Sequence, residues 1–403
     1  MKTVLAWALF DLANTFFAVA MLSFYFPLWV VEDRGAKELL FSVALGVSMA
    51  CVAILMPFCG ALSDATGERM RYLRWTTYGC VGATLLISVT SHLGLALVLF
   101  GIANMCYQLG TVFYDALLWK ITPPDRLGQT SGFGASFGYL GSVVGLLLLW
   151  PFVQAGGHRG AFAPSAVFFL LFAMPSFFLI REGASPLRMR WRDLARSASA
   201  RLAITIRSAS RLAGLWRYLW ASFFSMSAIN TVLVFMVVYT RKVMGFTEAQ
   251  VIHFFVFSQF FAIVGALVFG RFVARWGAKR TLSRIWLGWM GALGMVAISP
   301  TRGWVWIAGP IIGFCLGSTW ATARVLVTEL SPKDQLAEMF GLVGLFARAS
   351  SILGPLLWGL LVLNPARYHH AILLMIGLLA VGLAILRQVP DPHPVAAMKA
   401  ERS

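Results

Sequence analysis

The chain has 403 residues, of which 59% are hydrophobic and only 12% are charged, and its mean hydropathy is +0.78. Soluble globular proteins average about 45–50% apolar and about 25% charged residues, so this composition excludes a soluble protein and predicts one that spans a membrane. The 33 Lys and Arg residues against 16 Asp and Glu residues give a net charge of +17. Nucleic-acid binding is not needed to explain this charge, because membrane proteins collect basic residues on one side.

Apolar runs long enough to cross a bilayer recur along the whole chain. The first run is far longer than the core of a signal peptide and ends without a small-residue cleavage site, so we expect it to be a membrane span. A span needs about 20 mostly apolar residues. The expected helices are 4–31, 39–62, 72–90, 93–118, 132–151, 161–181, 215–240, 248–271, 282–299, 303–328, 338–363 and 369–387. The sequence therefore predicts an all-α multi-pass membrane protein with twelve transmembrane helices.

The longest interval without an apolar run lies between the sixth and seventh expected helices. It mixes regularly spaced Arg with Leu, Ile and Trp, which is typical of a basic amphipathic helix on a membrane surface. A flexible, solvated linker is the alternative. We predict an N-terminal six-helix lobe at 1–181, a basic cytoplasmic linker at 182–214, a C-terminal six-helix lobe at 215–390 and a cytoplasmic tail at 391–403.

The distribution of basic residues predicts the orientation of the chain. With the N-terminus inside, 24 Lys and Arg residues fall on the inner side and 7 on the outer side. This bias places both termini in the cytoplasm, and we expect the protein in a bacterial inner membrane. The same residues attract anionic headgroups, so membrane lipids are expected partners.

Two cytoplasmic segments recur in both halves at nearly the same offset. Asp125 lies in Thr-Pro-Pro-Asp-Arg-Leu, and Asp334 lies 209 positions later in Ser-Pro-Lys-Asp-Gln-Leu. The glycines of 60–69 likewise match those of 270–279. Two parallel repeats of this kind place a substrate site between the halves, near the midplane of the bilayer.

The loop after the second expected helix, Gly60-Ala-Leu-Ser-Asp64-Ala-Thr-Gly67-Glu-Arg69, resembles the signature between helices two and three of the major-facilitator superfamily. The resemblance implies two six-helix lobes that rock about a central site. Gly60 and Gly67 permit close packing and a tight turn. Asp64 can lie at the N-terminus of the eleventh helix and be stabilised by its dipole, which would latch the halves on the inner side; an ordinary turn aspartate is the alternative. The residues assigned to gating are Gly60, Asp64, Gly67, Arg69, Asp125, Arg324 and Asp334.

Three further segments resemble the autophagy-linked vacuolar amino-acid effluxer family and its bacterial relatives. They are Trp7-Ala-Leu-Phe-Asp11-Leu-Ala-Asn14-Thr-Phe-Phe17, then Phe113-Tyr114-Asp115 with the glycine-rich run to 141, and finally the stretch from Arg324 through Met339-Phe-Gly341 to Gly354-Pro355. Asp115 stands where this family is expected to have Asn. The resemblance implies export of amino acids or similar small solutes.

Two N-terminal helices carry polar side chains within the membrane. Asp11 and Asn14 share one face of the first helix. An aspartate there is costly unless it is protonated, paired or in contact with water, so Asp11 is either a proton-coupling or substrate-amine site or a structural hydrogen-bonding group. The fourth helix carries a polar stripe that must face protein or water, and we favour cavity lining over packing between helices. Its members are Asn104, Gln108, Thr111 and Asp115.

Asp115 lies near the cytoplasmic end and is alternatively a gate or a partner of Lys120. In the C-terminal half, Arg348 can meet a substrate carboxylate, pair with an acid or extend its charge toward the inner surface. Asn230 adds an amide to the seventh helix. Glycines at 134, 138, 141 and 145 form a stripe on the fifth helix that allows close helix packing.

The sequence contains no phosphate-binding loop, metalloprotease motif, nucleophile elbow or Cys–His metal cluster. An enzyme and an ATP-driven pump are therefore disfavoured, and we expect no metal or cofactor. We predict a monomeric secondary transporter that moves a small organic solute, with protons as the candidate coupling ion. The alternatives are a lipid-like or drug-like solute moved in either direction, and a membrane sensor or scaffold that transports nothing.

Overall fold

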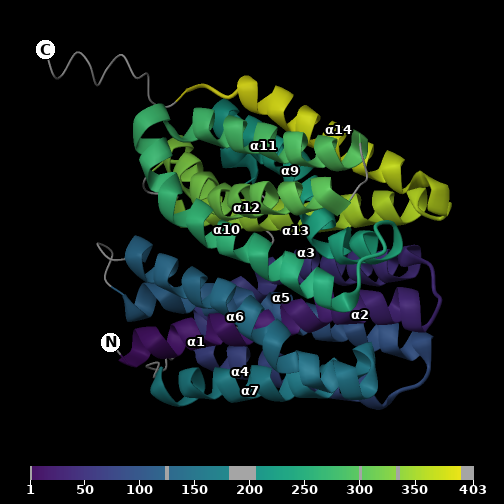
Figure 1. Ribbon diagram of the computed structural model, residues 1–403. Coiled ribbons are helices and arrows are strands. Elements are labelled where there is room, and N and C mark those ends of the chain that lie inside the picture. The colour runs from purple at the N-terminus through teal and green to yellow at the C-terminus, as the bar shows by residue number, and fades with distance from the viewer. Residues whose placement is uncertain (1, 123–126, 181–205, 299–301, 333–335, 392–403) are drawn as a thin grey trace, which may run out of the picture. The chain divides into compact units, whose positions relative to one another are not determined.

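The computed structural model describes residues 2–122, 127–180, 206–298, 302–332 and 336–391, and every regular element in these ranges is a helix (Figure 1). The chain divides into two compact units. The first is Met1–Leu202 with Leu233–Val238, and the second is Ala203–Val232 with Tyr239–Ser403. Most of the predicted linker and tail lies outside the described residues, although 206–211 are helical.

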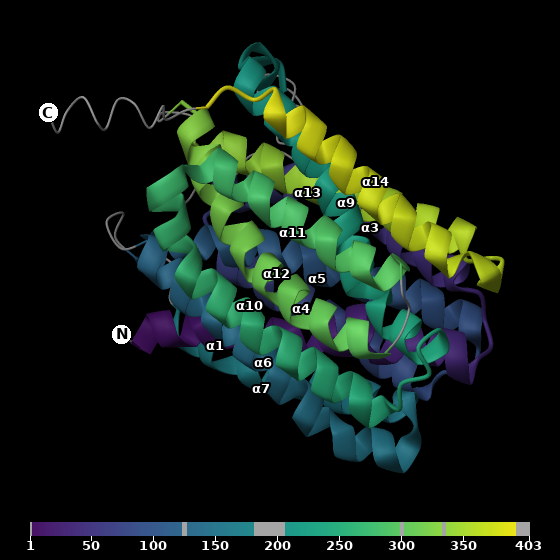
Figure 2. The same ribbon diagram turned by 45° about the horizontal axis from the view of Figure 1, so that its top comes forward.

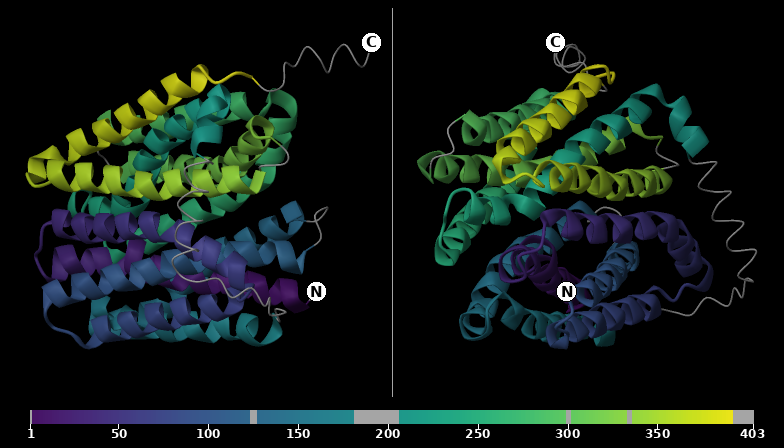
Figure 3. Two further views of the ribbon diagram at one scale, coloured as in Figure 1. Left: turned by 180° about the vertical axis from the view of Figure 1, so that it is seen from behind. Right: turned by 90° about the vertical axis from the view of Figure 1, so that its right-hand side faces the viewer.

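The helices of the first unit run side by side along one common direction (Figure 3). They are α1 (Lys2–Phe17), α2 (Tyr25–Leu28), α3 (Glu38–Thr66), α4 (Arg69–Val89), α5 (Leu93–Ile121), α6 (Leu127–Gly156) and α7 (Phe162–Leu179). Within this unit, α1 packs against α6 and α7, and α5 packs against α3 and α4.

The first expected helix is present in full extent, Lys2–Asp33, but its second half is not a regular α-helix. π-Helical turns at Ala18–Ser23 and Trp29–Asp33 flank α2, and Phe24 has φ −129° and ψ −78°. Pro27 lacks the N–H that an α-helix would use there. Aromatic packing holds this segment in place, because Phe26 stacks on Phe100 with ring centroids 4.8 Å apart.

The second unit repeats the same order of long helices (Figure 2). They are α9 (Ala213–Lys242), α10 (Glu248–Trp276), α11 (Ala278–Ile298), α12 (Arg302–Leu330), α13 (Leu336–Leu361) and α14 (Tyr368–Arg387). Within it, α12 packs against α10 and α11, and α14 lies along α11.

Among the described residues, a helix stands at each of the twelve predicted positions, and eleven of these helices are long and apolar enough to cross a membrane. The remaining one is α4, which is less apolar because Arg69, Arg71 and Arg74 occupy its first turns. Several helices extend beyond the apolar run from which they were predicted. For example, α3 continues to Thr66 because Gly67 adopts φ 67° and ends the helix with its N–H on the Ser63 carbonyl, 2.9 Å away.

The internal repeat extends from the loops into the packing of the helices. A Cβ on Gly79 of α4 would lie 2.8 Å from Sγ of Cys106 on α5. The corresponding pair, each residue 209 positions later, is Gly288 of α11 and Cys315 of α12, at 2.7 Å. In both halves, therefore, a glycine at the equivalent position leaves room for the equivalent cysteine. This supports two copies of one helix arrangement.

Candidate functional site

The polar centre of the first unit is built on a contact between α1 and α5. The Trp7 indole lies parallel to the Tyr114 ring, with centroids 4.6 Å apart, and its Nε1 donates to the Tyr114 carbonyl oxygen at 3.2 Å. Phe10 lies against the same tyrosine ring at 5.1 Å. Trp7 and Tyr114 are both buried, so this contact anchors the helix that carries Asp11.

Asp11 lies in contact with the glycine stripe of α6. A Cβ added to Gly138 would come within 2.9 Å of Oδ2 of Asp11, and one added to Gly134 would overlap the Trp7 ring. Gly141 admits Thr15, whose hydroxyl donates to the Leu12 carbonyl at 2.6 Å. The close helix approach predicted for these glycines is therefore observed, and its partner is α1. Asp11 itself is half-buried.

The two membrane aspartates predicted from the sequence both lie near one phenol, that of Tyr114. The carboxylates of Asp11 on α1 and Asp115 on α5 both act electrostatically on Tyr114. Asp115 is exposed, whereas Tyr114 is 4% exposed. The structure thus connects Asp11 and Asp115 through a residue to which the sequence assigned no role.

The polar stripe of α5 does not act as one surface. Asn104 is fully buried and donates from Nδ2 to the Ser48 hydroxyl of α3 at 2.7 Å, which is packing between helices. Thr111 donates to the backbone oxygen of Gln108 at 2.7 Å, a common use of hydroxyls in membrane helices. Gln108 is half-buried. Cavity lining therefore stays a prediction for Gln108 and Asp115, whereas Asn104 has a structural contact.

In the second unit, the candidate residues lie on α9 and α13. Nδ2 of Asn230 donates to the hydroxyl of Ser351 at 2.9 Å and lies 3.4 Å from that of Ser350. The half-buried Arg348 donates from a terminal nitrogen to the Gly344 carbonyl at 3.2 Å, one turn back along its own helix. The three roles considered for Arg348, which are a substrate carboxylate, an acid partner and extension toward the inner surface, stay predictions. Arg324 is exposed on α12.

The structure describes only some of the residues that were predicted to act in gating. Gly67 makes the predicted tight turn, with φ 67°. Arg69 approaches the Ala116 carbonyl of α5 at 3.5 Å. A Cβ on Gly60 would meet no described atom within 4 Å, so the unit itself requires no close packing there. Asp64 lies in the last turns of α3, and its predicted latch stays a prediction; Asp125 and Asp334 lie outside the described residues.

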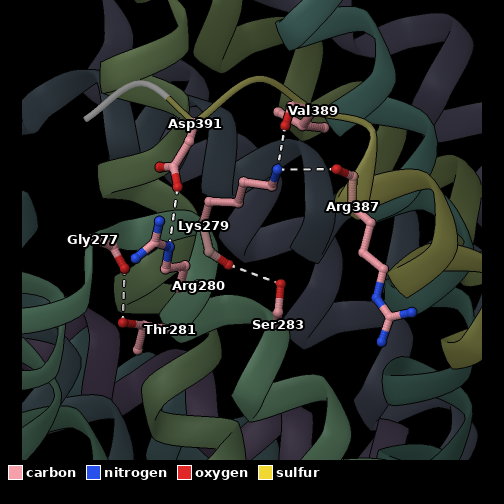
Figure 4. Close-up of polar contacts among 8 residues, drawn as sticks. All are labelled: Gly277, Lys279, Arg280, Thr281, Ser283, Arg387, Val389 and Asp391. Carbon is pink, nitrogen blue, oxygen red and sulfur yellow. Dashed lines mark hydrogen bonds and ion pairs between the residues drawn. The ribbon is translucent and has the colours of Figure 1, made fainter. Parts of the chain in front are cut away.

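The second copy of this loop binds the end of α14 (Figure 4). Nζ of Lys279 donates to the carbonyl oxygens of Arg387, at 3.0 Å, and of Val389. Nε of Arg280 lies 3.2 Å from Oδ2 of Asp391. A cation at the last carbonyls of a helix satisfies acceptors that have no partner within the helix and stabilises its dipole. Figure 4 shows these contacts converging on the chain that leaves α14.

The first unit places a cation in the same way. Arg74 of α4 donates to the Phe177 carbonyl in the last turn of α7 and lies over the Phe177 ring at 5.8 Å. Phe177 corresponds to Arg387 at an offset of 210. Basic residues near the start of α4 and α11 thus stabilise the last helix of their own unit.

Sequence reasoning assigned no role to Tyr114, Ser48 or Ser351, although Tyr114 belongs to a quoted motif. Their partners are 107, 56 and 121 positions away in the chain. No local spacing could have revealed these pairs. The glycine stripe of α6 was the one available signal, since it required a closely packed neighbour.

Comparisons with known proteins agree with this architecture. The family model of the Major Facilitator Superfamily matches residues 12–315 and again 250–402. An uncharacterised protein of Aquifex aeolicus is 24% identical over 385 residues, covering 94% of this chain and 95% of its own. An uncharacterised transporter of Bacillus subtilis, described as of the major-facilitator type, is 22% identical over 407 residues, covering 96% and 94%.

Two solved structures show the same fold. The nucleoside transporter NupG superposes with a TM-score of 0.75 at 12% identity and covers 96% of this chain and 99% of its own. A bacterial homologue of the human lysosomal transporter Spinster gives a TM-score of 0.69 at 13% identity, covering 96% and 95%. The family model, the curated relatives and the fold agree, and the chain is a membrane transporter that belongs to the Major Facilitator Superfamily.

Proposed function

We propose that this transporter moves a small organic solute by alternating access and that Asp11 couples the movement to protons. The observation that carries the proposal is the position of Asp11, which is half-buried on α1 with its carboxylate against Gly138. A carboxylate couples transport to protons if it gains a proton on one side of the membrane and releases it on the other. A position inside the helix bundle, where conformational change alters contact with water, suits that role.

We propose an amino acid or a similar solute as substrate, and export as the direction. The support is the resemblance of three segments to the vacuolar amino-acid effluxer family, together with the groups that the second unit offers. Arg348 is a guanidinium able to hold a carboxylate through two parallel hydrogen bonds. Asn230, on the neighbouring helix α9, supplies an amide that both donates and accepts hydrogen bonds.

We further propose that the transporter lies in a bacterial inner membrane as a monomer with both termini in the cytoplasm. The support is the excess of basic residues in the segments expected on the inner side, such as the first turns of α4 and α11, together with relatives in two bacteria. The same basic side suits anionic lipid headgroups.

The test is transport by the purified protein in proteoliposomes. A panel of amino acids and related solutes is screened with and without a pH gradient, and substrates are those that the gradient accumulates. Because Asn cannot exchange a proton, Asp11→Asn should abolish accumulation driven by the gradient while solute exchange between equal pools continues. The matched control is Asp115→Asn, at an exposed position, which should reduce accumulation less. Accumulation by Asp11→Asn at the wild-type level would exclude Asp11 as the coupling group.

A further inference from the structure

Tyr114 lies beside the part of α1 that carries Asp11. Its ring packs against Trp7, one turn before Asp11, and against Phe10, the residue before it, at centroid distances of 4.6 and 5.1 Å. Its backbone oxygen accepts the indole N–H of Trp7. The two ring contacts hold the phenol against this face of the helix, and the hydrogen bond ties the Tyr114 backbone to Trp7.

The hydroxyl of Tyr114 is buried and has no hydrogen-bond partner among the residues that the structure describes. A buried hydroxyl without a partner is less favourable than one that is hydrogen-bonded. The aromatic contacts of Tyr114 would be available equally to Phe, so packing alone does not explain the oxygen. Such a group is suited to a partner that needs it in only one state of the protein.

The ionisable side chains on the helices around Asp11 limit what that partner can be. On the described parts of α1, α5, α6 and α7 they are Lys2, Asp11, Cys106, Tyr107, Tyr114, Asp115, Lys120 and Tyr139. Of these, the two carboxylates of Asp11 and Asp115 act on Tyr114. A phenol donates a hydrogen bond, and an ionised carboxylate accepts one, so the chemistry points to a carboxylate that has lost its proton.

We propose that Tyr114 is a positioning residue for proton coupling, and that its hydroxyl donates a hydrogen bond to the carboxylate of Asp11 once Asp11 has released its proton. Of the two acids, Asp11, which the preceding proposal makes the coupling group, is the better candidate for accepting this hydrogen bond. Its helix packs directly on the tyrosine ring, whereas Asp115 is exposed and can be stabilised by water. The phenol then takes the place of water for a carboxylate held against α6.

This role predicts the direction in which proton release changes when the hydroxyl is removed. A hydrogen bond to the ionised form favours that form, so its loss disfavours release of the proton. Tyr114→Phe should therefore move the titration midpoint of Asp11 upward by about one pH unit. The ring contacts with Trp7 and Phe10 would remain, because Phe keeps the aromatic surface.

The experiment follows the protonated carboxyl groups of the purified, full-length protein in lipid by infrared difference spectroscopy over a pH titration. The band absent from Asp11→Asn belongs to Asp11, and the band absent from Asp115→Asn belongs to Asp115. Tyr114→Phe is compared with Tyr218→Phe, which removes a buried phenol from the second unit, where it bonds Ser222. We expect the titration midpoint of the Asp11 band to move to higher pH in Tyr114→Phe and to stay unchanged in Tyr218→Phe.

An unchanged titration midpoint of the Asp11 band in Tyr114→Phe overturns the inference. So does a change of midpoint confined to the Asp115 band, or the absence of any Asp11 band. This titration requires no substrate, so it separates the inference from the proposed function. If the Asp11 midpoint moves as expected in Tyr114→Phe while Asp11→Asn still accumulates solute, the contact with Tyr114 stands and coupling through Asp11 is wrong. If Asp11→Asn loses accumulation and the Asp11 midpoint does not move in Tyr114→Phe, coupling through Asp11 stands and Tyr114 has no part in it.

Discussion

Asp11 depends on the absence of a side chain at Gly138. An aspartate in a membrane helix requires a neighbour that either satisfies it or leaves room for it. Here α6 leaves room, because Gly138, which lies against the carboxylate, has no Cβ. The carboxylate and the glycine therefore belong to one contact between α1 and α6, although the first was predicted as a polar site and the second as packing.

Gly138→Ala should impair coupled transport, because its Cβ would lie 2.9 Å from Oδ2 of Asp11 and displace the carboxylate. The matched control is Gly145→Ala on the same stripe, where the nearest atom is a Phe16 carbon at 3.6 Å, an ordinary contact. Accumulation driven by a pH gradient should fall several-fold in the first variant and stay near wild type in the second. Equal transport by both variants would contradict the importance of this contact.

At the scale of helices, close packing in the second unit depends on three glycines of α12. Gly309, Gly313 and Gly317 lie on one face, where added side chains would overlap Phe254, Ser258 and Ala262 of α10. At two of these positions the obstacle is a backbone oxygen, which cannot rotate away as a side chain can. The two helices therefore pack with their backbones in close contact at this face.

Gly313→Ala should destabilise the protein by about 1–3 kcal/mol, since overpacking of a tight contact forces the backbone to shift. Gly291→Ala on α11 is the control, because no atom lies within 4 Å of its added Cβ. That variant should be neutral or slightly stabilising, given the better helix propensity of Ala. The measurement is the thermal unfolding midpoint in detergent, and a midpoint of Gly313→Ala at or above that of Gly291→Ala would contradict this account of the helix pair.

The end of α14 depends on Lys279 in the first turn of α11 (Figure 4). Lys279→Met should loosen this turn, because the carbonyls of Arg387 and Val389 lose a charged donor. A hydrogen bond contributes about 0.5–1.5 kcal/mol, so exchange of the Gln388 and Val389 amide hydrogens should become about two- to twelvefold faster. Arg275→Met, at an exposed position of α10, is the control. Unchanged exchange at both amides in Lys279→Met would show that Lys279 does not stabilise this turn.

At the scale of the whole molecule, the distribution of basic residues predicts the orientation in the membrane. Cysteine placed at the exposed Lys37 should react with a membrane-impermeant maleimide added to intact cells. Cysteine placed at the exposed Gln388 should react only after the cells are permeabilised. The parent protein, with its five cysteines, gives the background. The reverse pattern of labelling would place both termini outside.

The number, order and type of the helices could be read from the sequence because each depends on local information. A run of apolar residues specifies a membrane helix wherever its neighbours lie, and Gly67 ends α3 through its own backbone conformation. The exception was the second half of the first helix, where Phe24, Pro27 and the aromatic side chains of other helices impose π-helical turns. Hydropathy does not register such a change.

The sequence by itself determined that this protein is a helical membrane transporter with a repeated half, and it identified the acids and cations available for function. Only the tertiary structure decided which of them meet. It separated Asn104, bonded to Ser48, from the rest of its stripe, and it placed Tyr114 beside Asp11. The physical reason is that hydropathy and turn formation are set by neighbours in the chain. A contact between helices depends instead on where residues a hundred positions apart come to lie, and one sequence carries no local record of that.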